Sequence, residues 1–389
     1  MRPLDGLLIA DFSRVLAGPL ATATLADLGA RVIKVERPDG GDDTRAWGPP
    51  WTANSSSYFE SANRSKESVT LDLDAPADVV LAQELAARAD ILVENFRAGA
   101  LDRRGLGYAE VAARNPGIVY CSISGFGTAG GSDRAGYDFL VQAVGGLMSI
   151  TGEVSHEPMK VGVALVDVLT AKDAAIGILA ALRARAATGR GQRVEVNLLS
   201  SLLGSLVNQA SSYLATGDAP HRMGNAHPSI APYELLRCAD GPLAIACGND
   251  AQFRRLVTVI GKVSMADDPR YATNAGRVLN RPELVADLEA LLGGATAEEW
   301  SKRLGSVGVP AGKVGTVADG LRLADELGLD PLVDVGPDAP HQVRHAITYS
   351  ETPVTSYAAP PRLGEHSEDI RRWLASPAVE SEREGPRDE

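Results

Sequence analysis

The 389-residue sequence contains little cysteine, little histidine and few aromatic residues, and these shortages exclude several kinds of protein. Its three cysteines, Cys121, Cys238 and Cys247, lack the spacing of a zinc site or a disulfide framework, so we expect free thiols in a reducing compartment. Among the six histidines, only His341 and His345 have a metal-type spacing, and they lie in a strand-like segment. We therefore expect no metal site.

Positive charge and long apolar runs are also lacking. The 38 basic residues against 50 acidic ones give a net charge of −12, which argues against a general nucleic-acid binder. Asp5 and Asp11 interrupt the apolar N-terminus, so we expect no signal peptide, and no run approaches the roughly 18 apolar residues that suggest a membrane span. These features predict a cytoplasmic protein.

Strands and helices alternate through the first half of the chain. Such alternation predicts βαβ units and a parallel, doubly wound sheet, with ligands bound at the carboxyl ends of its strands. Strands are expected at 7–13, 31–37, 68–74, 90–96 and 118–124, and helices at 18–29, 75–89, 100–115 and 136–152.

The pattern changes after the segment 212–233, which is rich in Pro, Gly and His. Residues 233–248 indicate a β-hairpin around Asp240–Gly241, and helices follow at 251–261, 281–292, 296–307 and 316–328. Short strands are expected within 341–350. The expected divisions are a large domain at 1–200, a linker at 201–224, a small α+β domain at 225–325, a return segment at 326–375 and a flexible tail at 376–389.

Asp167 is the most informative residue, because it stands in the apolar stretch 161–171, where a strand-like run turns into an alanine-rich helix. Asp is seldom fully buried without a partner. One interpretation is a helix N-cap, for which Asp is a preferred residue. The other is a nucleophile whose charge is held by the positive end of the helix. The two interpretations are compatible.

A set of recognisable segments extends over nearly the whole chain: PLDGLLIADFSRVLAGP (3–19), LADLGARVIKVERPDGGDDTRAWGPP (25–50), NRSK (63–66), DILVENFRAGALDRRGLGY (90–108), YCSISGFG (120–127), RAGYDFLVQAVGGLMSITG (134–152), VDVLTAKDAAIGILAAL (166–182), TGRGQRVEVNLLSS (188–201), MGNAHPSIAPYE (223–234), GNDAQF (248–253) and PRLGEHSEDI (361–370). Together and in this order, these segments resemble the family III CoA-transferases of the CaiB/BaiF type. The sequence looks most like the branch that moves CoA between dicarboxylates, such as the succinyl-CoA–glutarate transferases.

The resemblance implies a Rossmann-like large domain, a smaller α+β domain and an interlocked homodimer. It implies acyl-CoA and a small carboxylic acid as partners, with CoA as a substrate and no permanently bound cofactor. Asp167 matches the nucleophile of the family, and Gly248, Asn249 and Gln252 belong to the matching active-site loop. The positions that match CoA contacts are Val15, Leu16, Arg37, Leu71, Leu73, Asn95, Phe96, Arg103, Arg104 and Tyr137.

The chemistry of such an enzyme suits a carboxylate nucleophile. An Asp side chain has an unperturbed pKa of about 4, so it is ionised at neutral pH without a partner base and can attack a thioester carbonyl. The implied sequence of steps passes through an aspartyl anhydride and an aspartyl-CoA thioester. A dicarboxylic acceptor also needs a cation for its distal carboxylate, and the unranked candidates are Arg45, Arg64, Lys66 and Arg222.

Three alternatives remain at this point. An α-methylacyl-CoA racemase on the same scaffold would place a histidine where Tyr137 stands, and tyrosine is a poor base at its ordinary pKa of about 10. A nicotinamide-dependent dehydrogenase could use Glu36 on a ribose, but the turn after the first strand lacks G-x-G-x-x-G. A non-catalytic acyl-CoA binder would have no need to retain Asp167.

Overall fold

The computed structural model describes residues 1–336 and 339–377. The chain forms two compact units. The large unit contains Met1–Gly145, Val161–Ser211 and the described residues of 330–377, and the small unit contains Gly146–Lys160 and Ser212–Leu329. Residues 378–389, which include most of the expected tail, lie outside the described part of the chain.

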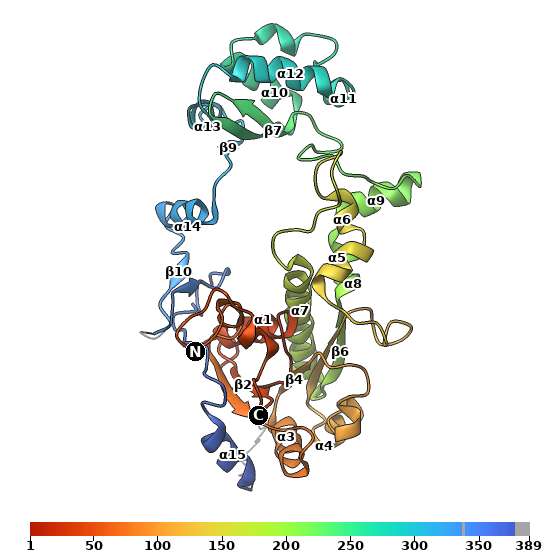
Figure 1. Ribbon diagram of the computed structural model, residues 1–389, viewed down its shortest axis with the longest axis vertical. Helices are drawn as coiled ribbons and strands as arrows, with labels where there is room; N and C mark the ends of the chain where they lie inside the picture. Colours follow the sequence, from red (N-terminus) through yellow and green to blue (C-terminus); the bar gives the residue numbers. More distant parts are fainter. Residues whose placement is uncertain (337–338, 378–389) are drawn as a thin grey trace, which may run out of the picture. The chain divides into compact units, whose positions relative to one another are not determined.

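A six-stranded parallel sheet forms the centre of the large unit (Figure 1). Its order is β3-β2-β1-β4-β5-β6, with strands β1 (Leu8–Asp11), β2 (Arg31–Glu36), β3 (Lys66–Thr70), β4 (Ile91–Glu94), β5 (Val119–Ser124) and β6 (Gln192–Asn197). The valines and isoleucines of β1 to β5 are buried, as expected of a sheet covered on both faces, while Val194 and Val196 of the edge strand β6 are half-buried. The predicted parallel α/β sheet is confirmed.

Helices cover both faces of this sheet. α1 (Ala17–Asp27) packs against α7 (Leu165–Thr188), which also contacts β5 and β6, while α15 (Ser367–Ala375) packs against α3 and β3. The remaining helices of the first 216 residues are α2 (Ser57–Glu60), α3 (Pro76–Arg88), α4 (Tyr108–Arg114), α5 (Asp138–Val144), α6 (Leu147–Ile150), α8 (Leu198–Ser205) and α9 (Val207–Thr216), with 3₁₀ turns η1 (Asp43–Ala46) and η2 (Asp102–Arg104).

The topology places a crevice at the middle of the sheet. The chain leaves β1 toward β2 and β3, and then returns to pair β4 with the other side of β1. The loops after β1 and β4 therefore diverge, and this is where ligands bind on open parallel sheets.

The small unit contains an antiparallel sheet of β7 (Tyr233–Cys238), β8 (Gly241–Ala246) and β9 (Ala311–Lys313), so the predicted hairpin is confirmed. Its helices are α10 (Asp250–Val259), α11 (Asn274–Leu279), α12 (Arg281–Leu292), α13 (Ala297–Gly305) and α14 (Val317–Glu326), with η3 (Val263–Ala266). Four of its helices follow the expected positions, and α11 is an additional short helix. The helices α10, α12 and α13 bury apolar side chains in the core of the unit, whereas the buried residue of α11 is Arg277 and α14 has no buried residue.

One local prediction is wrong, because residues 161–164 form no strand and helix α7 begins directly at Leu165. A short strand does occur within 341–350, but it is limited to Gln342–Val343 (β11), paired with β10 (Leu332–Val333).

Candidate active site

Asp167 is the third residue of α7 and lies in its first turn, so it is not the N-cap. The N-cap is Ala164, which supplies no side-chain bond. The Asp138 carboxylate from α5 does this work instead, because its Oδ1 accepts the N–H groups of Val166 at 2.7 Å and of Asp167 at 3.2 Å. The prediction that Asp167 caps α7 is therefore wrong. The Asp138 side chain caps this helix instead.

The Asp167 carboxyl is partly buried and has acidic surroundings. Burial, with the negative charge of Asp138 as the second cause, raises its pKa from 3.8 to about 7. The expectation that this group keeps its ordinary acidity is therefore wrong. Near neutral pH both its protonated and its ionised forms are populated.

Tyr58 on α2 is the second neighbour of this carboxyl. Burial, followed by the charges of Asp167, Asp138 and Asp42, raises the pKa of Tyr58 to about 12, so its hydroxyl stays protonated. The ring also packs edge-to-face on Trp47, with the centroids 5.3 Å apart. Neither Asp138 nor Tyr58 was identified from the sequence, although Asp138 directly follows Tyr137 in the family motif at 134–152.

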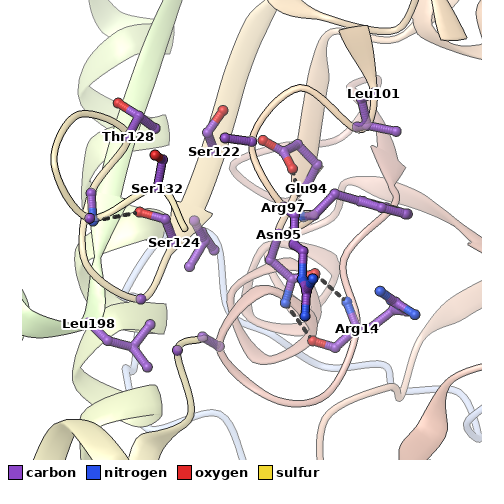
Figure 2. A pocket seen from close by; sticks show the side chains of 18 of the residues that line it. Arg14, Glu94, Asn95, Arg97, Leu101, Ser122, Ser124, Thr128, Ser132 and Leu198 are labelled. Atoms are coloured by element: carbon purple, nitrogen blue, oxygen red, sulfur yellow. Dashed lines mark hydrogen bonds between the residues drawn. The ribbon is translucent and has the colours of Figure 1, made fainter. Parts of the chain in front are cut away.

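A cavity of about 630 Å³ opens at the carboxyl ends of β1, β4 and β5 (Figure 2). Asp167 is one of the residues that line it. Its wall includes the loop after β1, the loop after β4 and the loop after β5. Of the residues predicted to contact CoA, Val15, Leu16, Asn95, Phe96 and Tyr137 line this cavity together with Asp167.

The loops that form the wall are tied to each other. The Asn95 side chain accepts the Arg14 N–H at 2.9 Å and donates to the Arg14 carbonyl at 2.7 Å. The Arg14 guanidinium lies over the Phe96 ring, 5.0 Å from its centroid. Glu94 accepts the Phe96 N–H at 2.8 Å. The loops after β1 and β4 thus present one continuous surface.

The other five predicted CoA contacts follow the same edge of the sheet without lining the described wall of the cavity. Arg37, after β2, pairs with Asp43 at 2.6 Å. Leu71, after β3, is buried in the core, and the carbonyl of Leu73 accepts from Arg104 Nε at 2.7 Å. Arg103 and Arg104 lie in η2, where Arg103 is exposed.

The loop 248–253 lies in the small unit and is organised as a helix cap. Asn249 caps α10 by accepting the Gln252 N–H at 2.9 Å, and Gln252 Oε1 accepts the Gly248 N–H at 2.8 Å. The side-chain oxygens of both residues are therefore occupied by local bonds. The assignment of Gly248, Asn249 and Gln252 to the reaction stays a prediction.

Three of the four candidate cations for a distal carboxylate make internal ion pairs. Arg45 pairs with Glu36 at 2.7 Å, Arg64 with Asp27 at 2.6 Å and Lys66 with Asp11 at 3.0 Å. Arg222 has no such ion pair in the described part of the chain, and its Nε donates to the Glu153 carbonyl at 3.3 Å.

Glu36 bears on the dehydrogenase alternative. Its carboxylate is buried, binds Arg45 through two nitrogens at 2.7 Å and accepts from Ser68 at 2.6 Å. Its oxygens are therefore used in bonds within the fold and do not face a ribose site. No cluster of potential metal ligands occurs among the described residues. Their helices also include none that is long and apolar enough to cross a membrane.

These features define an enzyme with a carboxyl group in a cavity at the switch point of a Rossmann-like sheet. The model of CoA-transferase family III matches residues 4–367, and the chain belongs to this family. The family predicted from the sequence motifs is thereby confirmed, and the protein is a CoA-transferase.

Individual relatives are similar over their whole lengths. The succinate–glutarate CoA-transferase of Agrobacterium fabrum is 42% identical, with 95% of this chain and 94% of that protein covered. The succinyl-CoA:glutarate CoA-transferase of Mus musculus is 40% identical, with 95% and 86% covered. Among solved structures, a CaiB/BaiF family protein from Brucella suis has a TM-score of 0.86 and 44% identity, with 96% and 99% covered.

Proposed function

We propose that this enzyme transfers CoA from an acyl-CoA donor such as succinyl-CoA to a small dicarboxylic acid such as glutarate, with Asp167 as the covalent nucleophile. The observation that carries the nucleophile assignment is the position of the Asp167 carboxyl, in the wall of the cavity and at the positive end of a 24-residue helix. The names of the relatives support the choice of acids. The racemase alternative is not favoured, because these relatives are transferases.

The reaction proceeds in four balanced steps. An Asp167 oxygen attacks the thioester carbonyl, the C–S bond breaks, and CoA leaves as a thiolate from a mixed anhydride. The thiolate attacks the aspartyl carbonyl, which releases the first acid and forms an aspartyl-CoA thioester. The acceptor carboxylate displaces the thiolate from this thioester to form a second anhydride. Attack of the thiolate on the acceptor carbonyl then frees Asp167 and the new acyl-CoA.

The raised pKa of Asp167 suits this role. A more basic carboxylate is a better nucleophile, and partial burial removes water that would shield it and hydrolyse the intermediates. With a pKa of about 7, a substantial fraction of the group is still ionised at neutral pH.

CoA binds along the carboxyl edge of the sheet in this proposal. Val15, Leu16, Asn95, Phe96 and Tyr137 contact it in the cavity, and Arg37, Leu71, Leu73, Arg103 and Arg104 contact it along the adjoining rim. The amides of Gly248 and Asn249 and the Gln252 side chain stabilise the oxyanion. This last assignment requires the Gln252 side chain to exchange its local bond for a bond to the substrate.

The active enzyme in this proposal is an interlocked homodimer in the cytoplasm. Apolar side chains on α5, α7 and the segment around α8 are exposed in the single chain, among them Phe139, Val144, Ile176 and Leu203. Such side chains are normally covered in a monomer or mark an interface. The three free cysteines agree with a reducing compartment.

Trapping the acyl-enzyme tests the mechanism. After incubation with succinyl-CoA, hydroxylamine or borohydride should modify the peptide that contains Asp167, as read by mass spectrometry. Asp167→Ala is the matched control and should remain folded but lose turnover by about three or more orders of magnitude. An unmodified Asp167 peptide in an active preparation would contradict the assignment. A panel of mono- and dicarboxylic acids with succinyl-CoA as donor identifies the acceptor.

A further inference from the structure

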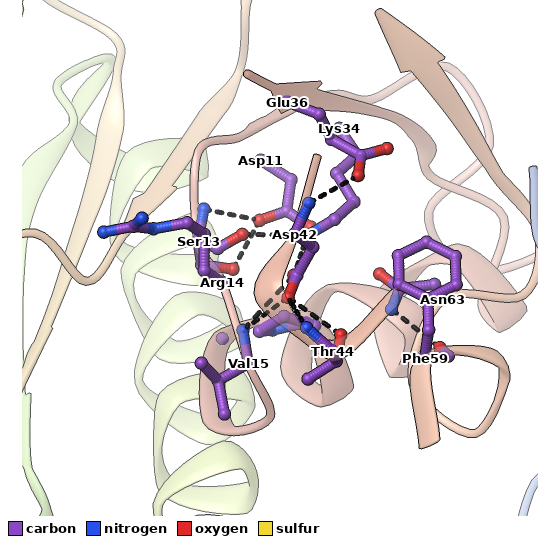
Figure 3. Close-up of polar contacts among 12 residues, drawn as sticks. Asp11, Ser13, Arg14, Val15, Lys34, Glu36, Asp42, Thr44, Phe59 and Asn63 are labelled. Carbon is purple, nitrogen blue, oxygen red and sulfur yellow. Dashed lines mark hydrogen bonds and ion pairs between the residues drawn. The ribbon is translucent and has the colours of Figure 1, made fainter. Parts of the chain in front are cut away.

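The segment Ser13–Leu16, between β1 and α1, has an unusual number of its backbone groups held by side chains from other elements (Figure 3). Asp11 accepts the Ser13 N–H at 3.0 Å, and Lys34 Nζ donates to the Ser13 carbonyl at 2.8 Å. Asn95 binds both backbone groups of Arg14, as described above. The Asp42 carboxylate accepts the Val15 N–H, at 3.2 and 3.3 Å from its two oxygens.

Val15 explains why this segment must be held. Its φ is +71°, in the left-handed region that β-branched residues strongly disfavour. Such backbone strain persists only where the surrounding structure imposes it, and it is concentrated at functional sites. Here the strained residue lines the cavity next to Leu16. The Asp42 carboxylate is the group that fixes its N–H.

Lys34 and Asp42 work as one unit. Their charged atoms are 2.9 Å apart, and both side chains are 0% exposed. Burial opposes the charge of Lys34, but the Asp42 and Asp11 carboxylates outweigh burial and raise the pKa of the ammonium. Burial likewise opposes the Asp42 charge, and Lys34 outweighs it to lower the pKa of that carboxyl. Both groups stay ionised at neutral pH, so they hold each other in place. Lys34 also holds the Ser13 carbonyl, and Asp42 holds the Val15 N–H.

We propose that Lys34 and Asp42 are positioning residues for acyl-CoA: the pair clamps Ser13 and Val15 so that Val15 and Leu16 face the ligand. This rests on the proposed function, in which Val15 and Leu16 contact CoA. Neither Lys34 nor Asp42 lines the cavity, so the pair acts through the backbone that it holds.

The informative variant replaces both charges together. Lys34→Met with Asp42→Leu removes the clamp without leaving an uncompensated buried charge, which would itself unfold the sheet. We expect the KM for acyl-CoA to rise on the order of tenfold, because Val15 is then no longer kept in its strained backbone conformation, and we expect a smaller change in kcat. Lys34→Met with Asp42→Asn restores an acceptor for the Val15 N–H, and should recover part of the loss.

Asp27→Asn is the matched control, because Asp27 also forms a buried ion pair, with Arg64, but makes no contact with the segment 13–16 in the described structure. It should lower stability while leaving the KM near that of the native enzyme. An equal rise in KM for this control, or an unchanged KM for the folded Lys34→Met/Asp42→Leu variant, overturns the proposal.

Val15→Gly provides a second measurement that does not depend on the Lys34→Met/Asp42→Leu variant folding. It uses Lys34→Met/Asp42→Asn, which leaves no unpaired buried charge and keeps only a neutral acceptor for the Val15 N–H. Glycine adopts this φ without strain, so Lys34→Met/Asp42→Asn should raise the KM less in the Val15→Gly enzyme than in the native one. Equal effects in both backgrounds also overturn the proposal. The trapping experiment with native enzyme distinguishes a failure of this proposal from a failure of the proposed function. If the proposed function is wrong, the peptide that contains Asp167 stays unmodified.

Discussion

At the residue scale, the Asp167 carboxyl has two neighbours that the linear sequence separates from it. Asp138 is 29 positions away and Tyr58 lies in another helix, yet both interact electrostatically with the group. The Asp138 carboxylate, which caps α7, has two opposite effects. It orders the first turn of α7, and it makes the ionised form of Asp167 less favourable.

The pH dependence of the first half-reaction should report this interaction. Because Asp167 must be ionised to attack, kcat/KM for acyl-CoA should rise with pH toward a plateau, with a midpoint near 7 in the native enzyme. In Asp138→Asn the negative charge is gone, so ionisation of Asp167 becomes easier and the midpoint should move to lower pH. The amide oxygen can still accept from Val166 and preserve the cap.

Asp173→Asn serves as the control for this measurement, because Asp173 is an exposed carboxyl on the same helix. Its midpoint should equal that of the native enzyme. A native midpoint near pH 4, or a midpoint that Asp138→Asn leaves in place, would show that Asp138 does not tune the nucleophile.

At the element scale, the loop between β5 and α5 depends on two glycines in direct backbone contact. A Cβ on Gly136 would lie 2.3 Å from the Gly125 Cα, which is too close for any side chain. This contact brings the start of α5, with Tyr137 and Asp138, back to the end of β5. The loop thereby places the cap of α7.

Gly136→Ala should therefore reduce turnover by roughly tenfold to a hundredfold through displacement of α5 from the end of α7, while circular dichroism stays native-like. Gly130→Ala is the matched control in the same loop. A Cβ there meets open space, so its turnover should be unchanged. Native turnover in Gly136→Ala would mean that the loop absorbs the added methyl group without moving the cap.

At the scale of the whole molecule, exposed apolar side chains on the large unit support the proposed dimer. Ile176, in the middle of α7, is 64% exposed, whereas the neighbouring Ala175 and Ile178 of the same helix are buried in the fold. We expect light scattering to give a mass of about twice the 40.8 kDa of one chain.

Ile176→Glu should weaken this dimer, because it places a charge in an apolar interface. Val80→Glu, at a similarly exposed apolar position on α3, should leave the mass unchanged. A monomeric native protein with full activity would contradict the dimer, whatever the variants do.

Local patterns in the amino-acid sequence were enough to predict most of the strands and helices and the family. Alternating apolar segments predicted the parallel sheet and its helices, since periodicity and turn residues are local properties of the chain. Motifs distributed along the chain were enough to identify a CoA-transferase and to select Asp167.

The surroundings of Asp167 depend on contacts between distant parts of the chain. Asp138 on α5 caps α7 and raises the pKa of Asp167, and the Lys34–Asp42 pair holds Val15; each of these contacts joins residues from different elements. Burial and partner distance set the energy of a charge, and neither can be read from spacing along the chain. For the same reason, Arg45, Arg64 and Lys66 were open candidates in the sequence, and in the fold they are the ion-pair partners of buried carboxylates.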